Sequence, residues 1–227
     1  MINSGSAPAA AQSTLLAGLG PAATHAILGA AKIRRISAKR AITARGQQAT
    51  HLFLVQTGRV RYYHLTKQGE LVVLGCLVPG DVVGLMALLL KSPSAYMASA
   101  EATSDCVLLA WDHAVVRSFV DLYPLLGENG SRIAIGYLQN YIERHVGLVT
   151  ETAEERLART LLKLGHRTGT THHDGVEIRA TNAELGALAD VSPFTASRVL
   201  NDWVRAGTVS KGRGRILLHA PEALMID

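Results

Sequence analysis

Residues 181–203 read TNAELGALADVSPFTASRVLNDW, and this stretch carries the start signals of two consecutive helices. Thr181 is followed three residues later by Glu184, a capping box that satisfies free N–H groups in a first helical turn. Ser192 is a second capping residue, and Pro193 after it takes the first helical position, where a missing N–H costs nothing. The stretch therefore predicts a pair of helices with a short connection.

Apolar spacing gives each of these helices one face for burial. Asp190-Val191 predicts the turn between the helices, and Gly207 predicts the end of the second. The inward-facing residues are Leu185, Leu188 and Ala189 on the first helix, and Ala196, Val199, Leu200 and Trp203 on the second. The outer face of the second helix presents Phe194, Ser197, Arg198 and Asn201.

A basic segment follows the helix pair. Residues 208–219, TVSKGRGRILLH, predict two strands around a Lys-Gly-Arg-Gly-Arg tip. Residues 198–215 contain one acidic residue, Asp202, and five basic ones, which are Arg198, Arg205, Lys211, Arg213 and Arg215. Helix pairs are common, but a pair with a basic wing favours DNA, with the second helix in the major groove and the wing on phosphates.

The N-terminal half shows a different pattern, short apolar runs separated by turn signals. The runs are HLFLVQTG (51–58), RVRYYHL (59–65), LVVLGCLV (71–78) and CVLLAW (106–111). Such spacing predicts an antiparallel sandwich or barrel between about residues 33 and 112. Residues 15–31 predict short helices before it, and residues 1–13 a flexible tail.

A helical period follows the strands. A stripe of mostly apolar residues repeats at spacings of three and four and consists of Ile135, Leu138, Ile142, His145, Val149 and Thr152. This spacing is typical of a coiled-coil seam, which favours a dimerisation helix over residues 121–152. The alternative is a helix that packs on its own domain.

Composition excludes several classes of protein. The charge-free apolar run Val82–Leu90 is too short to cross a membrane, and the N-terminus lacks a signal-peptide pattern, so we expect a cytoplasmic protein without membrane contact. We interpret Cys76 and Cys106 as buried free thiols, and no histidine spacing indicates a metal site. No motif combines a nucleophile, a base and an oxyanion donor, so an enzyme is not expected.

Four stretches together carry a family resemblance: LFLVQTGRVRYY (52–63), LVPGDVVG (77–84), ERLARTLLKLG (155–165) and the helix pair. With them the chain resembles, over residues 15–220, the cyclic-AMP receptor protein/fumarate-nitrate regulator (Crp/Fnr) superfamily. The resemblance implies an α+β fold in three parts. These are a β-sandwich sensor domain of the double-stranded β-helix, cyclic-nucleotide-binding type (14–120), a dimerisation helix (121–152) and a winged helix-turn-helix domain (153–227).

The resemblance also places an effector pocket around the loop GDVVGLMALLLKSPSAYM (80–97). Nucleotide-binding members carry there a Glu for the ribose and an Arg for the cyclic phosphate, and Leu85 and Ser94 stand at these two positions. A buried phosphate without a charged partner costs several kcal/mol, so cyclic AMP is not the expected effector. The implied pocket residues are Gly84, Leu85, Met86, Ser94, Ala95, Tyr96 and Tyr141, although Tyr141 and Tyr137 equally suit packing at a dimer interface.

Other family cofactors find little support. Iron–sulfur members need cysteines near the N-terminus, and no cysteine precedes Cys76. Carbon-monoxide-sensing haem members place a Cys and a His at the positions of Gly84 and Met86 here. Haem held by other ligands stays open, with His51, His64 and Cys76 as candidates, but we assign none because such strand residues are more often packed in a core.

The function that the resemblance implies is a homodimeric DNA-binding regulator. Its recognition helices shift relative to one another when the sensor pocket is occupied, and its partners are a palindromic double-stranded operator, a second copy and, as a further candidate, RNA polymerase. The implied DNA contacts are Thr181, Ser192, Phe194, Thr195, Ser197, Arg198, Asn201, Lys211, Arg213 and Arg215. Two alternatives remain: a regulator that needs no effector and is controlled by abundance, and a small-molecule-binding module without a DNA role.

Overall fold

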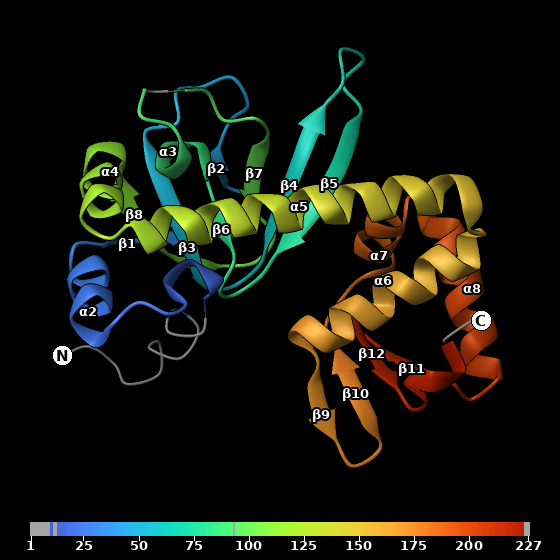
Figure 1. The fold of residues 1–227 in the computed structure, drawn as a ribbon. Coiled ribbons are helices and arrows are strands. Elements are labelled where there is room, and N and C mark those ends of the chain that lie inside the picture. The colour runs from blue at the N-terminus through green and yellow to red at the C-terminus, as the bar shows by residue number, and fades with distance from the viewer. Residues whose placement is uncertain (1–9, 11–12, 93, 225–227) are drawn as a thin grey trace. The chain divides into compact units, whose positions relative to one another are not determined.

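The structure, a computed structural model, describes residues 10, 13–92 and 94–224 (Figure 1). The chain divides into two compact units, with the boundary between Asn140 and Tyr141. The long helix α5 (Pro124–Thr150) contributes its first part to one unit and its last turns to the other.

The first unit contains two antiparallel sheets of four strands each. One sheet has the order β1-β8-β3-β6, with bounds Lys32–Ile36, Cys106–Asp112, His51–Thr57 and Val82–Val83. The other has the order β2-β7-β4-β5, with bounds Ala41–Thr43, Ser99–Ala102, Val60–Leu65 and Leu71–Leu77. This architecture confirms the predicted β-sandwich, and β3, β4, β5 and β8 are the four strands that the apolar runs predicted.

Strand β3 is buried on both faces, which explains why its sequence is apolar at consecutive positions. Leu52 and Leu54 face a core shared with helices, while Phe53 and Val55 face the second sheet. A strand buried on both faces loses the alternation of a half-exposed strand. The covering helices are η1 (Thr14–Leu16), α2 (Pro21–Gly29), α3 (Met86–Leu89), α4 (His113–Leu122) and the first turns of α5.

Helix α5 differs from the expected span of residues 121–152 at both ends. It begins at Pro124, because Tyr123 closes α4 in a non-helical conformation. Thr152 lies beyond it and caps α6 instead. The stripe itself is exposed in the single chain, since the side chains of Ile135, Leu138, Ile142 and Val149 are each more than half accessible.

The second unit builds its core from helices and a third antiparallel sheet. Its helices are α6 (Ala153–Thr168), α7 (Asn182–Ala189), α8 (Pro193–Arg205) and η2 (Pro221–Leu224). The sheet has the order β11-β12-β10-β9, with bounds Val209–Gly212, Arg215–Leu218, Gly175–Ile178 and Thr170–His172. The predicted two-stranded wing is therefore half of a larger sheet, because β10 pairs with β12.

The predicted helix boundaries are confirmed. The Thr181 side chain accepts a hydrogen bond from the N–H of Glu184, and Ser192 accepts one from the N–H of Thr195. Asp190 closes α7 in the left-handed conformation. All four residues predicted to face inward on α8 are buried, and on α7 Leu185 and Ala189 are buried while Leu188 is half-buried.

Both cysteines are free thiols, Cys106 buried and Cys76 half-buried. Burial raises the pKa of the Cys106 thiol above its ordinary value. Within residues 10, 13–92 and 94–224, no three His, Cys, Asp or Glu side chains gather as a metal site. No helix in that part of the chain is long and apolar enough to cross a membrane.

Candidate nucleic-acid interface

Helix α8 presents one polar row to solvent. Phe194 is 80% exposed, and Arg198 and Asn201 are also exposed, while Ser197 is half-buried. The row faces outward because Ala196, Val199, Leu200 and Trp203 hold the other side of α8 in the core of the second unit. This arrangement confirms the outward face expected from the helical period. The aromatic ring of Phe194 lies at the end of the row nearest the helix start.

A hollow lies between the starts of the two helices and the wing. The first residues of α7, Asn182 and Ala183, line it together with the cap Thr181. Pro193 and Phe194 contribute from the start of α8. The wing residues around it are Lys211, Gly212, Gly214, Arg215 and Ile216. The hollow therefore brings predicted residues from three elements together and adds Asn182, which the sequence analysis missed although it follows the cap directly.

The wing places Arg213 at its tip. Gly212 pairs with Arg215, so Arg213 and Gly214 form the two-residue turn, and Gly214 adopts a φ of 68°. A positive φ at the second turn position is easy for glycine and unfavourable for other residues. Within the described part of the chain, neither Arg213 nor Arg198 forms an ion pair or a side-chain hydrogen bond, so both guanidinium groups are open to an anionic ligand.

A hydrogen bond connects the wing to α8. The Lys211 Nζ donates to the side-chain oxygen of Asn201 at 3.2 Å. Since an ammonium group can only donate, the accepting atom of Asn201 must be its oxygen, and the amide nitrogen remains as a donor. Asn201 therefore offers N–H groups to a ligand at this surface.

Acidic residues neutralise part of the basic cluster. Arg205 pairs with Asp202 one turn earlier on α8. Glu177 of β10 lies 3.6 Å from Nη1 of Arg215 and 3.8 Å from Nε of Arg179, measured from its carboxylate oxygens. The sequence segment 198–215 contains a single acid, but the folded surface adds Glu177, which lies far away in sequence.

Three of the predicted contact residues have local structural roles. The Thr181 hydroxyl donates to the Glu184 carboxylate at 2.9 Å while it caps α7. The hydroxyls of Ser192 and Thr195 are 2.9 Å apart, and Ser192 caps α8. These hydroxyls stabilise the two helix starts that border the hollow.

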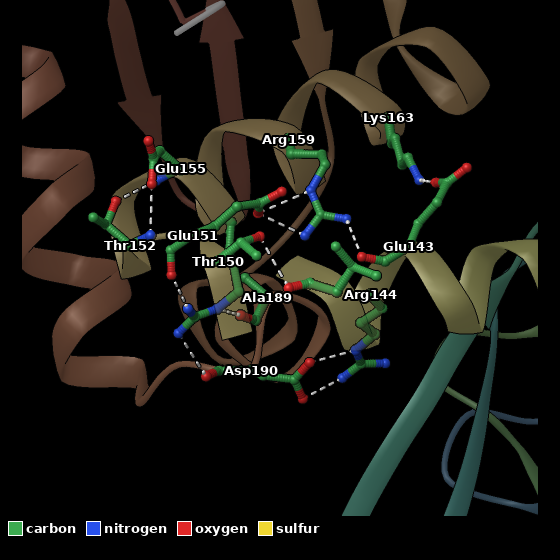
Figure 2. A network of polar contacts seen from close by, with 12 residues as sticks. Glu143, Arg144, Thr150, Glu151, Thr152, Glu155, Arg159, Lys163, Ala189 and Asp190 are labelled. Carbon is green, nitrogen blue, oxygen red and sulfur yellow. Dashed lines mark hydrogen bonds and ion pairs between the residues drawn. The ribbon is translucent and has the colours of Figure 1, made fainter. Parts of the chain in front are cut away.

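Side chains from α5 and α6 hold the turn between α7 and α8 (Figure 2). Arg144 on α5 pairs through two nitrogens with the Asp190 carboxylate. Arg156 on α6 donates to the carbonyl of Ala189 at 3.0 Å. The turn therefore has partners on two other helices, although caps and apolar spacing were its only sequence signals.

The structure brings part of the predicted effector pocket together in the first unit. Tyr96 is buried against Ala87 and Ala49, and Met86 packs on the same cluster. The Tyr96 hydroxyl donates to the backbone oxygen of His51 at 3.1 Å and accepts from its N–H at 3.2 Å. A Cβ built on Gly84 would lie 3.0 Å from the Tyr96 ring.

Ser94 borders this cluster, because its backbone oxygen accepts a hydrogen bond from the N–H of Ala49 at 2.6 Å. Leu85 is buried in the helix-covered core, Ser94 is half-buried and Ala95 is exposed. Tyr141 belongs to the second unit. Tyr137, one turn earlier on α5, contacts the sandwich, with its hydroxyl donating to the backbone oxygen of Val82 at 3.1 Å.

The nominal haem candidates sit in the strands. The His51 ring is hydrogen-bonded or paired at both nitrogens, with Thr50 at 2.8 Å and Asp112 at 3.1 Å. His64 on β4 and Cys76 on β5 are both half-buried. The described contacts of His51 are those of a structural residue.

A β-sandwich, a long helix and a winged helix-turn-helix with an exposed polar reading face define a DNA-binding regulator with an N-terminal sensor-type domain. Comparisons with known proteins agree with this class. The model of the cyclic nucleotide-binding domain matches residues 33–123, and that of the Crp-like helix-turn-helix domain matches residues 155–225.

Relatives cover nearly the whole chain. The cyclic AMP receptor protein of Thermus thermophilus is 31% identical over 95% of both chains. The nitrogen fixation regulation protein FixK of Azorhizobium caulinodans is 29% identical over 78% of this chain and 71% of its own. The fold resembles that of FixK2 from Bradyrhizobium japonicum, with a TM-score of 0.76 at 22% identity over 86% of this chain and 95% of that one. The chain belongs to the Crp/Fnr family of transcriptional regulators.

Proposed function

We propose that this regulator is a cytoplasmic homodimer that reads a palindromic operator through α8 and does not respond to cyclic AMP. Residues 14–120 serve as the sensor domain, the helix within residues 121–152 as the dimer contact, and residues 153–227 as the DNA-binding domain. The observation that carries the proposal is the exposed row of α8, with Arg198 at its centre and the basic wing beside it.

DNA reading follows from the chemistry of that row. Arg198 carries two parallel N–H donors, the pattern that matches the O6 and N7 acceptors of guanine in the major groove. Phe194 offers an apolar ring for a thymine methyl group, and Asn201 offers amide donors. Lys211, Arg213 and Arg215 on the wing supply positive charge for phosphates and carry no sequence information.

Dimerisation is supported by the stripe of α5. Four large apolar side chains recur there at the spacing of a coiled-coil seam, and each is more than half exposed in the single chain. An apolar stripe of this kind is stabilised when a second copy covers it. Two copies related by a two-fold axis present two reading helices, which is why the operator is palindromic.

Independence from cyclic AMP is supported by the pocket residues. A relative from Thermus thermophilus is named a cyclic AMP receptor protein. In this chain, however, buried apolar Leu85 stands where the nucleotide binders carry their ribose-binding acid, and uncharged Ser94 stands at the phosphate-binding position. A buried phosphate would lack a charged partner there, so the effector is an apolar or weakly polar molecule, or none is needed. RNA polymerase is the further partner of a regulator that activates.

Selection from a random pool of DNA duplexes tests the proposal. The wild-type chain is expected to enrich a palindromic motif, and Arg198→Ala is expected to relax preference at one base pair of each half-site. Arg213→Ala is the matched control, because it removes the same type of side chain from the wing instead of from α8 and should leave the motif unchanged. An unchanged motif with Arg198→Ala, or no enrichment with the wild type, would contradict DNA reading by α8.

A further inference from the structure

The turn between α7 and α8 depends on a residue in an unfavourable conformation. Asp190 has φ 53° and ψ 45°, and Lys39 is the other non-glycine residue with positive φ in the part of the chain that the structure describes. A non-glycine residue pays an energetic cost in this region unless its surroundings fix it. The Asp190 N–H donates to the carbonyl of Gly186, and the N–H of Val191 donates to the same oxygen at 2.9 Å.

Arg144, which lies outside the helix pair, forms hydrogen bonds with this turn. Its Nε and Nη2 donate to the two carboxylate oxygens of Asp190, and Nη2 also donates to the carbonyl of Ala187 at 2.9 Å. Ala187 lies in the last turn of α7, where carbonyls lack helical partners. The two charged side chains are only 18% and 26% exposed, so solvent screens the pair less than it would a surface pair.

A second arginine holds the same turn from α6. Arg156 donates to the carbonyl of Ala189 at 3.0 Å and to that of Asp190 at 3.5 Å. It also donates to the carbonyl of Glu151 at 2.7 Å, in the connection between α5 and α6. The end of α5, the start of α6 and the α7–α8 turn therefore form one connected set of charge-assisted hydrogen bonds.

A neighbouring arginine in Figure 2 joins α5 and α6 without contacting the turn. Arg159 donates through Nη2 to the Glu151 carboxylate at 2.7 Å, and through Nη1 to the carbonyl of Glu143 at 3.5 Å. Gly147 makes room for it, because a Cβ there would lie 2.2 Å from its Nη2. Arg159 provides a natural comparison for Arg144.

We propose that Arg144 is a positioning residue for DNA recognition, which fixes the α7–α8 pair against the last turns of α5. The inference rests on the proposed function, because α5 is there the contact between two copies. If each reading helix is fixed to its own α5, the α5–α5 contact sets the separation of the two reading helices. Arg144 then determines which spacing between half-sites the dimer prefers, whereas Arg198 determines which bases each half-site contains.

The fixed geometry of the contact explains why arginine is needed. A planar guanidinium with parallel donors holds a carboxylate in one orientation, while a lysine ammonium holds it as a point charge. Arg144→Lys keeps the charge and is expected to keep affinity while losing part of the spacing preference. Asp190→Gly keeps the left-handed backbone without strain and removes only the carboxylate.

The test measures binding of purified full-length variants to a set of duplexes. The duplexes carry the operator selected by the wild type, with the spacer shortened or lengthened by one base pair. Arg144→Met and Asp190→Gly are each expected to reduce the wild-type spacing preference by about tenfold, within the usual range of coupling between sites. Combining them should add little to either change, because both remove the same interaction. Preference for bases within a half-site should stay unchanged in both.

Arg159→Met is the matched control and is expected to keep the wild-type spacing preference. Circular dichroism and thermal unfolding verify that each variant is folded, and Asp190→Gly provides the second route should Arg144→Met fail to fold. Retention of the spacing preference by folded Arg144→Met or Asp190→Gly would overturn the inference while leaving DNA reading intact. A wild type that selects no palindromic site would instead overturn the proposed function.

Discussion

Lys211 on the wing donates a hydrogen bond to the side-chain oxygen of Asn201 on α8, so the wing fixes which atoms of Asn201 face outward. The remaining amide nitrogen can only donate, which suits the acceptor atoms of guanine, the O4 atom of thymine or the oxygens of a phosphate. If α8 reads DNA as proposed, the wing contributes to recognition through a neighbouring side chain as well as through its own charge.

Asn201→Asp tests this relationship. The carboxylate can still accept from Lys211, but it offers no donor and repels the negatively charged DNA, so operator affinity is expected to fall about tenfold or more. Fluorescence anisotropy with the selected operator measures the change. Asn201→Gln is the control, since it keeps an amide on a longer side chain and should lose less. Wild-type affinity in Asn201→Asp would show that this amide contacts no acceptor on DNA.

Charge at the wing should affect all DNA sequences equally. Arg213→Ala removes one proposed phosphate contact, so it is expected to weaken every duplex to the same extent and to reduce the slope of log affinity against log salt by about one. Glu177→Gln is the opposite change, because it frees Arg215 and Arg179 from their shared acid. That variant should bind all duplexes more tightly. A salt series on specific and random duplexes checks both, and a loss confined to the operator would argue against phosphate contact by Arg213.

The dimer should depend on the stripe of α5. Replacing Leu138 and Ile142 with Asp places like charges in a seam that needs apolar side chains, so the double variant is expected to sediment as a monomer. Sedimentation velocity provides the measurement. The matched control is Glu143→Gln, on the same helix turn but paired with Lys163 of α6. A dimer that persists in the double variant would place the interface elsewhere.

Cyclic AMP and cyclic GMP should neither bind tightly nor change DNA binding. The reason is the proposed correspondence of Leu85 and Ser94 to the ribose-binding acid and the phosphate-binding base of the family, which would leave a buried phosphate unpaired. Isothermal titration calorimetry is expected to give no binding at micromolar nucleotide. Affinity of micromolar or better for either nucleotide would contradict the pocket assignment.

The two thiols should react at different rates. Cys106 is 2% exposed, and its Sγ lies 3.3 Å from the carbonyl oxygen of Arg59 and 3.2 Å from that of Ser104, either of which can accept its one S–H. Burial raises the pKa of this thiol, so less of it is thiolate at pH 8. Cys76 is half-buried. Labelling with a chromogenic disulfide is expected to modify Cys76 at least about tenfold faster than Cys106. Cys76→Ser should remove the fast phase, and a fast phase that survives would assign the reactive thiol to Cys106.

The helix pair and the central strands could be predicted because their signals are local. The caps at Thr181 and Ser192 act within three residues, and the period of α8 decides by itself that Arg198 faces solvent. Strand β3 is apolar from Leu52 to Val55, where both of its faces are buried. Strand β1 was missed for the opposite reason, since its residues KIRRI are mostly exposed and show no alternation. The hairpin of β9 and β10 gave a similarly weak pattern.

The sequence by itself determined the helix pair and the row of side chains on α8, because caps, turns and apolar periods act over a few neighbouring residues, and its quoted stretches carried the resemblance to the family. The tertiary structure alone decided the charge partners: Glu177 for Arg215, and Arg144 for Asp190 across 46 residues of chain. The strength and geometry of an ion pair depend on distance and burial in space, and neither quantity is encoded in the local spacing of residues.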